Sequence, residues 1–371
     1  MSYYSAPMNL NISTHFSASY REARTQFLAA AGRRDLTVQT HVHPLHRGAE
    51  GEELAMDTVR IGPANAKALL VVSSGVHGAE GFCGSGCQVA LLHDDELLGR
   101  IAKSGTALLL VHAVNPYGFS HLRRVNEDSI DPNRNFLDYS QPLPVNKGYA
   151  QVHPLVLPEA WPPTADNVAA VNSYIAQHGA RHFQNAVSTG QSTHPDGLFY
   201  AGRAPAWSNL TLRRVLREHG AGCTQVAWID IHTGLGPPGH GEKIYAGRDD
   251  AVELARTRAC WGADVFSPFT GDSFSEAVRG STVSCMYDEC PGTATLAVGL
   301  EFGTLDFMAV MTAMRGDQWL TNHPEAPEAL HQSIKEALRA AFCIDSPEWR
   351  GMVCAQTRVA VLQALTALAS A

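Results

Sequence analysis

The sequence has 371 residues, of which 45% are hydrophobic and 17% are charged, a composition typical of a globular protein rather than a disordered one. Its formal net charge of −8 comes without basic runs or acidic tails, so nothing in it predicts binding to nucleic acid or to an anionic membrane. We therefore expect the partner to be a small molecule or a peptide.

The cysteines and the N-terminal residues indicate the cellular compartment in which the protein is expected. The eight cysteines contain no CxxC pair, and residues 1–5 show no basic-then-apolar leader. We interpret the cysteines as free thiols, which predicts a cytoplasmic protein in a reducing environment. No apolar run approaches the roughly 20 residues that a membrane-spanning helix needs, so we expect no membrane association.

The first elements expected along the chain are a helix and a hairpin. Residues 17–31 have the apolar spacing of an amphipathic helix. Two segments with alternating polarity, 36–43 and 54–61, bracket a turn-rich stretch and predict an antiparallel pair of strands.

Four apolar runs then predict the centre of a sheet. A strand at 68–72, a helix at about 81–101 and a strand at 107–114 have the spacing of a βαβ unit. Two further buried strands are expected at 225–231 and 295–303. Parallel strands of this kind are buried on both faces, which explains why the runs are apolar throughout.

The remaining segments are helices and long loops. Loops are expected at 117–163 and 266–291, a short strand at 243–245, and helices at about 165–182, 208–219, 251–261 and, as three helices, 306–370. We predict a single α/β domain over residues 1–371, with a mixed, mostly parallel central sheet and helices on both faces. Its catalytic core covers about 14–305, and a helical C-terminal layer covers about 306–371.

The stretch from Val71 to Gly81 carries the first candidate site residues. It ends the strand at 68–72 and turns into a helix, so His77 and Glu80 follow the carboxyl end of a strand, where ligands bind in open α/β sheets. Glycines permit a tight turn here, and an imidazole and a carboxylate three residues apart can point at one cation. The structural alternative is a polar turn with a capping glutamate.

Other polar side chains stand at the ends of apolar strands. Asp230 and His232 follow one strand, Glu301 ends another, and Asn133 and Arg134 lie in the long loop at 117–163, between His77 and His232. A catalytic zinc ion needs three ligands of the histidine or carboxylate kind and a separate carboxylate that accepts a proton from water. Taken singly, His232 could instead be a core histidine, and Glu301 a buried carboxylate paired with an arginine.

The order of these motifs resembles a known group of metalloenzymes. The matching segments span roughly residues 14–305 and include 74–82, 131–136, 190–200, 230–234 and 300–304. Together they are similar to the M14-like zinc carboxypeptidases and their deacylase relatives of the aspartoacylase type. Within that superfamily they most closely resemble the uncharacterised DUF2817 family.

The resemblance implies the roles of the metal-site residues. His77, Glu80 and His232 would bind one zinc ion per chain, and Glu301 would serve as general base and general acid. Asp230 lies two residues before His232 and would share its face of a strand, so it could orient the imidazole. The alternative for Asp230 is a turn or capping residue.

The resemblance also implies residues that bind the substrate. Asn133 and Arg134 match the pair that grips a free carboxylate, which suits a planar guanidinium. Arg124, or its neighbour Arg123, would polarise the scissile carbonyl and stabilise the oxyanion. Tyr287 is a candidate for the tyrosine that closes over the substrate in the carboxypeptidases. The structural alternative for the Asn133–Arg134 pair is a loop anchor.

We therefore predict a zinc metallohydrolase that cleaves an amide bond next to a free carboxylate, as a metallocarboxypeptidase does. One alternative is a deacylase that acts on an N-acyl amino acid or a small metabolite, and another is a non-catalytic binding protein. A serine hydrolase is disfavoured because the sequence contains no GxSxG motif. The histidines at 41, 43 and 46 are interpreted as exposed strand-end residues rather than as a second metal site.

Overall fold

Four parallel strands form the centre of the sheet because their sequences are apolar on both faces. In spatial order they are β4 (Thr106–His112), β3 (Ala68–Ser73), β5 (Gln225–Gly234) and β8 (Ala294–Gly303). Every residue of β3 and β4 is buried. All four strands were predicted from apolar runs, and the computed structural model, which describes residues 12–369, confirms them. Residues 1–5, considered above for a leader, lie outside the described part.

Antiparallel strands extend the sheet at both edges. The complete order is β1-β2-β4-β3-β5-β8-β6-β7, and four of the seven strand pairs are parallel. The added strands are β1 (Val38–Arg47), β2 (Glu53–Ile61), β6 (Gly241–Tyr245) and β7 (Val265–Phe266). The predicted hairpin is β1 with β2, and the predicted mixed sheet is confirmed.

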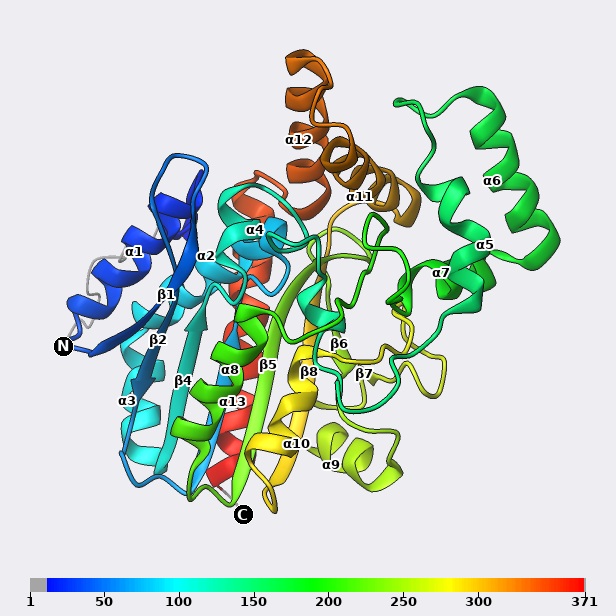
Figure 1. Ribbon diagram of the computed structural model, residues 1–371. Helices are drawn as coiled ribbons and strands as arrows, with labels where there is room; N and C mark the ends of the chain where they lie inside the picture. The colour runs from blue at the N-terminus through cyan, green and yellow to red at the C-terminus, as the bar shows by residue number, and fades with distance from the viewer. Residues whose placement is uncertain (1–11, 370–371) are drawn as a thin grey trace.

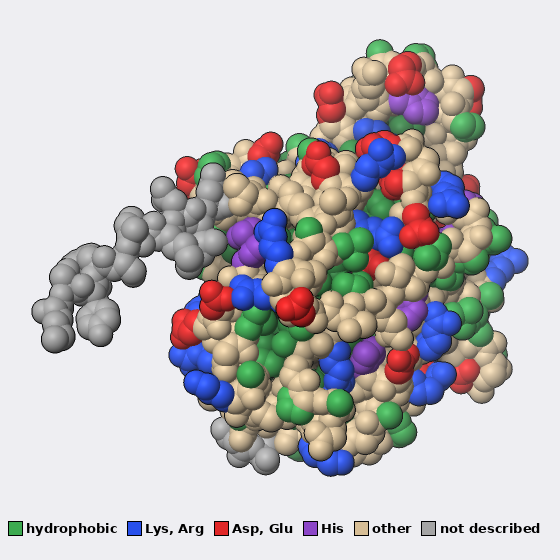
Figure 2. Space-filling view, turned by 90° about the vertical axis from the view of Figure 1, so that its left-hand side faces the viewer, with side chains coloured by type: hydrophobic (Ala, Val, Ile, Leu, Met, Phe, Trp, Pro, Cys, Tyr) green, Lys and Arg blue, Asp and Glu red, His purple; other side chains and the backbone are tan. Residues whose placement is uncertain are grey.

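Helices cover both faces of this sheet, as predicted (Figure 1). One face packs against α1 (Tyr20–Gly32), α2 (Gly81–Leu92), α3 (Asp95–Ser104), α9 (Ala251–Trp261) and α13 (Pro347–Ala369). The other face packs against α8 (Trp207–Gly220) and α10 (Cys285–Glu289). On the face of the molecule drawn in Figure 2, acidic and basic side chains are interspersed.

A further group of helices stands beyond the carboxyl ends of the central strands, in the upper part of Figure 1. The group consists of α5 (Lys147–Val156), α6 (Ala165–His178), α7 (Ala180–Ser188), α11 (Phe307–Asn322) and α12 (Glu328–Phe342). Their apolar faces share one cluster of buried residues. This cluster is separate from the two that cover the sheet, and it forms the wall of the candidate site described below.

Several expected boundaries are wrong for local reasons. The helix expected at 81–101 is two helices, because Asp94 caps α3 by accepting a hydrogen bond from the backbone of Leu97 (2.9 Å). The helix expected at 165–182 also breaks in two, at Gly179, whose φ of +90° favours glycine. The two long loops contain short helices, among them α4 (Pro116–Ser120), α5 and α10.

Helix α13 corrects the expectation about membrane-spanning length. It has 23 residues and a mean hydropathy of 1.4, so its length and composition would suffice to cross a membrane. In this structure Trp349, Val353 and Ala360 are buried against the sheet and its helices, and the Trp349 indole Nε1 donates to the Gly303 carbonyl at 3.0 Å. Packing in the core therefore accounts for part of its apolar sequence, since 44% of its most apolar window is buried.

The packing of α13 predicts the effect of removing its largest buried side chain. Trp349 is 1% exposed, so Trp349→Ala should lower the free energy of unfolding by about 3–5 kcal/mol, as measured by chemical denaturation. Val359, on the same helix, is 51% exposed, and Val359→Ala should change that free energy by less than about 0.5 kcal/mol. Equal small effects would contradict the packing of this helix.

Candidate active site

The candidate site lies at the carboxyl edge of the sheet, where three neighbouring parallel strands end. The register places Ser73 of β3 beside Asp230 of β5, and His232 of β5 beside Glu301 of β8. Residues more than 200 positions apart in the sequence therefore meet at one edge. This is the general position of ligand sites in open α/β sheets.

The loop between β3 and α2 carries two of the predicted ligands and is held by a close backbone contact. A Cβ added to Gly78 would lie 1.9 Å from the carbonyl carbon of Gly118, so only glycine fits there. The backbone N–H groups of Gly78 and Ala79 donate to the carbonyls of Arg124 (3.1 Å) and Arg123 (2.9 Å). The contact brings the loop against the segment that carries the two arginines.

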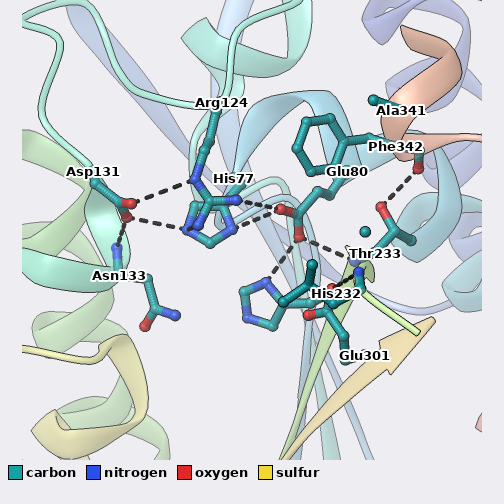
Figure 3. A network of polar contacts seen from close by, with 12 residues as sticks. His77, Glu80, Arg124, Asp131, Asn133, His232, Thr233, Glu301, Ala341 and Phe342 are labelled. Atoms are coloured by element: carbon teal, nitrogen blue, oxygen red, sulfur yellow. Dashed lines mark hydrogen bonds and ion pairs between the residues drawn. The ribbon is translucent and has the colours of Figure 1, made fainter. Parts of the chain in front are cut away.

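The Glu80 carboxylate lies at the centre of the site (Figure 3). Its Oε1 is 2.8 Å from His77 Nδ1 and 2.9 Å from Arg124 Nη1, and its Oε2 is 2.9 Å from His232 Nδ1. The backbone N–H of Thr233 also donates to Oε2, at 3.1 Å. One ligand atom from each of His77, Glu80 and His232 lies within 4.8 Å of the others, and all three side chains are buried. The structure thus brings the three predicted ligands together.

Each imidazole is held by a second carboxylate at its other nitrogen. His232 Nε2 is 2.8 Å from Asp230 Oδ2, as the sequence predicted, and His77 Nε2 is 3.1 Å from Asp131 Oδ1 and 2.9 Å from Arg124 Nη2. Such carboxylates fix the orientation of ligand histidines. No role was expected for Asp131, because an aspartate followed by Pro132 in a loop has the ordinary pattern of a turn.

The charge of this cluster fits a divalent cation. Burial alone would raise the pKa of Glu80 and Asp131, but the imidazoles and arginines around them hold both pKa values well below their usual range. The Nε2–H of His232 donates to Asp230. If the imidazole is neutral, its Nδ1 then carries a lone pair, and this lone pair faces a Glu80 oxygen. A proton or a metal ion is needed between them, and two imidazoles with one carboxylate form a donor set that zinc prefers.

The structure distinguishes between the two neighbouring arginines. Arg124 points into the site, where its Nη1 pairs with Glu80 and its Nε lies 3.5 Å from Asp131 Oδ2. Arg123 points away, and its Nε lies 3.7 Å from Asp317 Oδ2. Arg124 is therefore the arginine that lines the cavity, and Arg123 is not part of its lining.

Arg134 is a buried cation that is held by backbone carbonyls. It is 5% exposed, and no carboxylate of residues 12–369 lies within ion-pair distance of it. Its Nε and Nη2 donate to the Ser188 carbonyl (3.1 and 2.6 Å), and its Nη1 donates to the Asn133 carbonyl (2.9 Å). Burial lowers the pKa of Arg134 to about 10, and two of its N–H groups remain open to an anion.

Glu301 lies on β8 with its carboxylate toward the site. Its Oε1 accepts a hydrogen bond from the backbone of Leu235 at 3.0 Å, and no arginine or lysine in the described chain pairs with it. Desolvation by the surrounding protein, with the negative charge of Glu80 as a second cause, raises the pKa of Glu301 to about 7. The alternative of a structural glutamate paired with an arginine is therefore not what the structure shows.

Tyr287 does not reach the site. It lies on α10, where its hydroxyl donates to Glu253 Oε2 at 2.8 Å and its ring lies 3.8 Å from the Arg248 guanidinium carbon. These partners hold the ring away from the cavity, so the expected tyrosine that closes over the substrate is not provided by this residue.

The site residues line a cavity with about 190 Å³ of space for solvent. Phe199, which the sequence analysis passed over within a longer motif, lies between the two site arginines. The ring centroid is 5.2 Å from the Arg124 guanidinium carbon and 5.1 Å from that of Arg134. Its backbone has a φ of +52°, an unusual value for an aromatic residue, and such strain often marks a functional site. No sequence pattern predicted this conformation.

The fold and this site define an α/β protein with a candidate metal centre at the carboxyl edge of its sheet. The chain belongs to the DUF2817 family, described as a protein of unknown function, whose profile matches residues 16–356. Among curated proteins, none matches the sequence.

Three solved structures illustrate the similarity of the fold. Carboxypeptidase A from Helicoverpa armigera is 14% identical, with a TM-score of 0.43 over 87% of this chain and 73% of that one. A metallo-carboxypeptidase from Burkholderia cenocepacia is 15% identical, with a TM-score of 0.40 over 93% and 71%. Thrombin activatable fibrinolysis inhibitor is 12% identical, with a TM-score of 0.44 over 88% and 75%.

The cluster predicts which histidine is needed to hold a metal. His77→Ala removes one of three ligand groups, so zinc affinity should fall by at least about 100-fold, as measured by competition with a chromogenic chelator. His46→Ala, at an exposed histidine of β1, is the matched control and should leave zinc affinity unchanged. Equal zinc affinity in the two variants would contradict the ligand assignment.

Proposed function

We propose that the protein is a zinc-dependent hydrolase that cleaves an amide bond next to a free carboxylate. The observation that carries the proposal is the arrangement of a His77–Glu80–His232 donor set, a free Glu301 carboxyl and an unpaired Arg134 guanidinium around one cavity. A non-catalytic binding pocket would not need, beside the metal ligands, a carboxyl group that no arginine or lysine of the described chain pairs with.

His77, Glu80 and His232 would hold the metal, and Asp131 and Asp230 would orient the two imidazoles. Zinc bound there would supply a Lewis acid that lowers the pKa of a water molecule and polarises a carbonyl group. The remaining steps belong to side chains of this chain.

Glu301 is suited to move the proton that the reaction requires. As a carboxylate it accepts a proton from the attacking water, and as a carboxylic acid it donates that proton to the nitrogen of the leaving amine. A pKa of about 7 allows both states near neutral pH. Arg124, already fixed by Glu80 and Asp131, stabilises the negative charge that develops on the carbonyl oxygen.

Arg134 is suited to bind the carboxylate of the leaving group. Its two open N–H groups match the two oxygens of a carboxylate, and burial strengthens the interaction because little water competes. Asn133 and Phe199 line the same part of the cavity. A free carboxylate bound here would place the adjacent amide bond toward Glu301 and the metal ligands.

The role of Glu301 predicts a selective loss of turnover. Glu301→Gln keeps the shape of the side chain and removes the proton acceptor, so kcat on an amide substrate should fall by about 10²–10⁴-fold. Zinc content and thermal stability should remain those of the wild type. Glu336→Gln, the same change at an exposed position of α12, should leave kcat unchanged. Normal turnover by a zinc-loaded Glu301→Gln protein would refute the mechanism.

The role of Arg134 predicts a loss that depends on the carboxylate of the substrate. Arg134→Gln should lower kcat/KM by about 10- to 100-fold on substrates with a free carboxylate, because it removes a charge-assisted hydrogen bond. The same variant should change kcat/KM on carboxamide analogues by less than about threefold. Arg134→Lys keeps the charge but lacks the planar guanidinium group. Its kcat/KM on substrates with a free carboxylate should therefore lie between that of the wild type and that of Arg134→Gln. An equal loss on both substrates would show that Arg134 has only a structural role.

A further inference from the structure

One wall of the cavity consists entirely of apolar side chains. Four of them come from α11 and one from the last residue of α12, and we call them the α11 wall: Phe307, Val310, Met311, Met314 and Phe342. Four of them belong to the buried cluster that packs the helices beyond the sheet, and the partly buried Phe307 packs against that cluster. The wall is thus built by the fold and is not an accidental exposure of single residues.

The α11 wall adjoins the residues that would carry out the chemistry. The Thr233 hydroxyl donates to the Phe342 carbonyl at 2.6 Å, which fixes the end of α12 to β5. A Cβ added to Gly234 would lie 3.3 Å from the Phe342 ring and also 3.3 Å from Glu301 Oε1. The ring and the carboxylate therefore flank the same point.

A group of polar side chains in the cavity surrounds Arg134. Arg134 bonds to the Ser188 carbonyl, the Ser188 hydroxyl bonds to Gln184, and all three line the cavity with Asn133. In Figure 3, Asn133 and Phe342 lie on opposite sides of the His77–Glu80 pair. A carboxylate bound at Arg134 therefore leaves the α11 wall, which lies beside Glu301 at Phe342, for the acyl side of the scissile bond.

The apolar nature of the α11 wall limits the chemical groups that the cavity can accept on the acyl side of the scissile bond. A peptide on that side would bring backbone amides and a charged amino terminus against the wall, and burying such groups without hydrogen bonds is unfavourable. The five side chains of the wall offer no hydrogen-bond donor, and the backbone of α11 is already paired within its helix. A hydrocarbon chain needs no such partners and gains free energy from burial.

We propose that the α11 wall binds an apolar acyl chain, so that the preferred substrate is an amino acid N-acylated with a linear hydrocarbon chain. This inference rests on the proposed function. Water adds to the acyl carbonyl, the carbon–nitrogen bond breaks, and the nitrogen takes up a proton, so the products are a carboxylic acid and a free amino acid. Met311 and Met314 suit chains of variable length because methionine adapts its shape.

The test compares acyl groups on a constant leaving amino acid. Zinc-loaded wild-type protein is assayed on N-acetyl-, N-butanoyl-, N-hexanoyl- and N-octanoyl-leucine, with glycyl-leucine as the peptide. We expect kcat/KM to rise by about threefold for each added CH₂ until the wall is covered. Glycyl-leucine should be hydrolysed no faster than N-acetyl-leucine.

Substitutions in the α11 wall test its role independently of the rest of the site. Met311→Gln should lower the ratio of kcat/KM for octanoyl- over acetyl-leucine by about tenfold, and Met311→Leu should keep that ratio. Phe307→Gln, at a less buried position, provides a second polar variant if Met311→Gln folds poorly. Met308, 39% exposed on the same helix and outside the cavity lining, is the matched control, and Met308→Gln should keep the ratio.

The outcomes distinguish the two proposals. If the zinc-loaded protein hydrolyses none of these amides, the proposed function fails and the inference fails with it. If glycyl-leucine is hydrolysed as fast as octanoyl-leucine, or if neither polar variant changes the octanoyl preference, the acyl-chain inference is overturned while the proposed function stands.

Discussion

The arrangement of the site depends on the Glu80 carboxylate. Its two oxygens lie within hydrogen-bond distance of both imidazoles, the Arg124 guanidinium and the backbone N–H of Thr233. These groups come from the loop after β3, from β5 and from the segment after α4, so one side chain joins three separate parts of the chain. A buried carboxylate is stable only with such partners, and the metal that we propose there would share the same oxygens.

Hydrogen bonds connect the surroundings of this carboxylate to the core of the sheet. Trp228 Nε1 donates to the Ser73 hydroxyl at 2.7 Å, that hydroxyl donates to Asp230 at 2.5 Å, and Asp230 holds His232. The chain of contacts runs from the core of the sheet to the site, so the strands fix the imidazole before any ligand binds. The helices beyond the sheet supply the cavity walls instead. On our proposal the strand ends therefore determine the chemistry, and α7 and α11 determine which substrate fits.

Much of the fold could be predicted from local patterns. Continuous apolar runs predicted β3, β4, β5 and β8, because strands buried on both faces need them. The points at which such strands end then indicated His77, Glu80, His232 and Glu301 as candidates. Local patterns missed helix boundaries such as the one that Asp94 creates by capping α3. They also missed the environment of α13, because hydropathy alone does not distinguish a core helix from a membrane-spanning one.

The sequence by itself determined which residues could form a metal centre, because their chemistry and their places at strand ends are local properties. Only the tertiary structure decided that Arg124 rather than Arg123 faces the site, that Asp131 holds His77, and that Tyr287 stays away from the cavity. These side chains lie in loops or on short helices, which lack the periodicity that fixes side-chain direction in a strand. Their directions follow instead from long-range contacts such as the close approach of Gly78 to the backbone at 118–124, which no local pattern encodes.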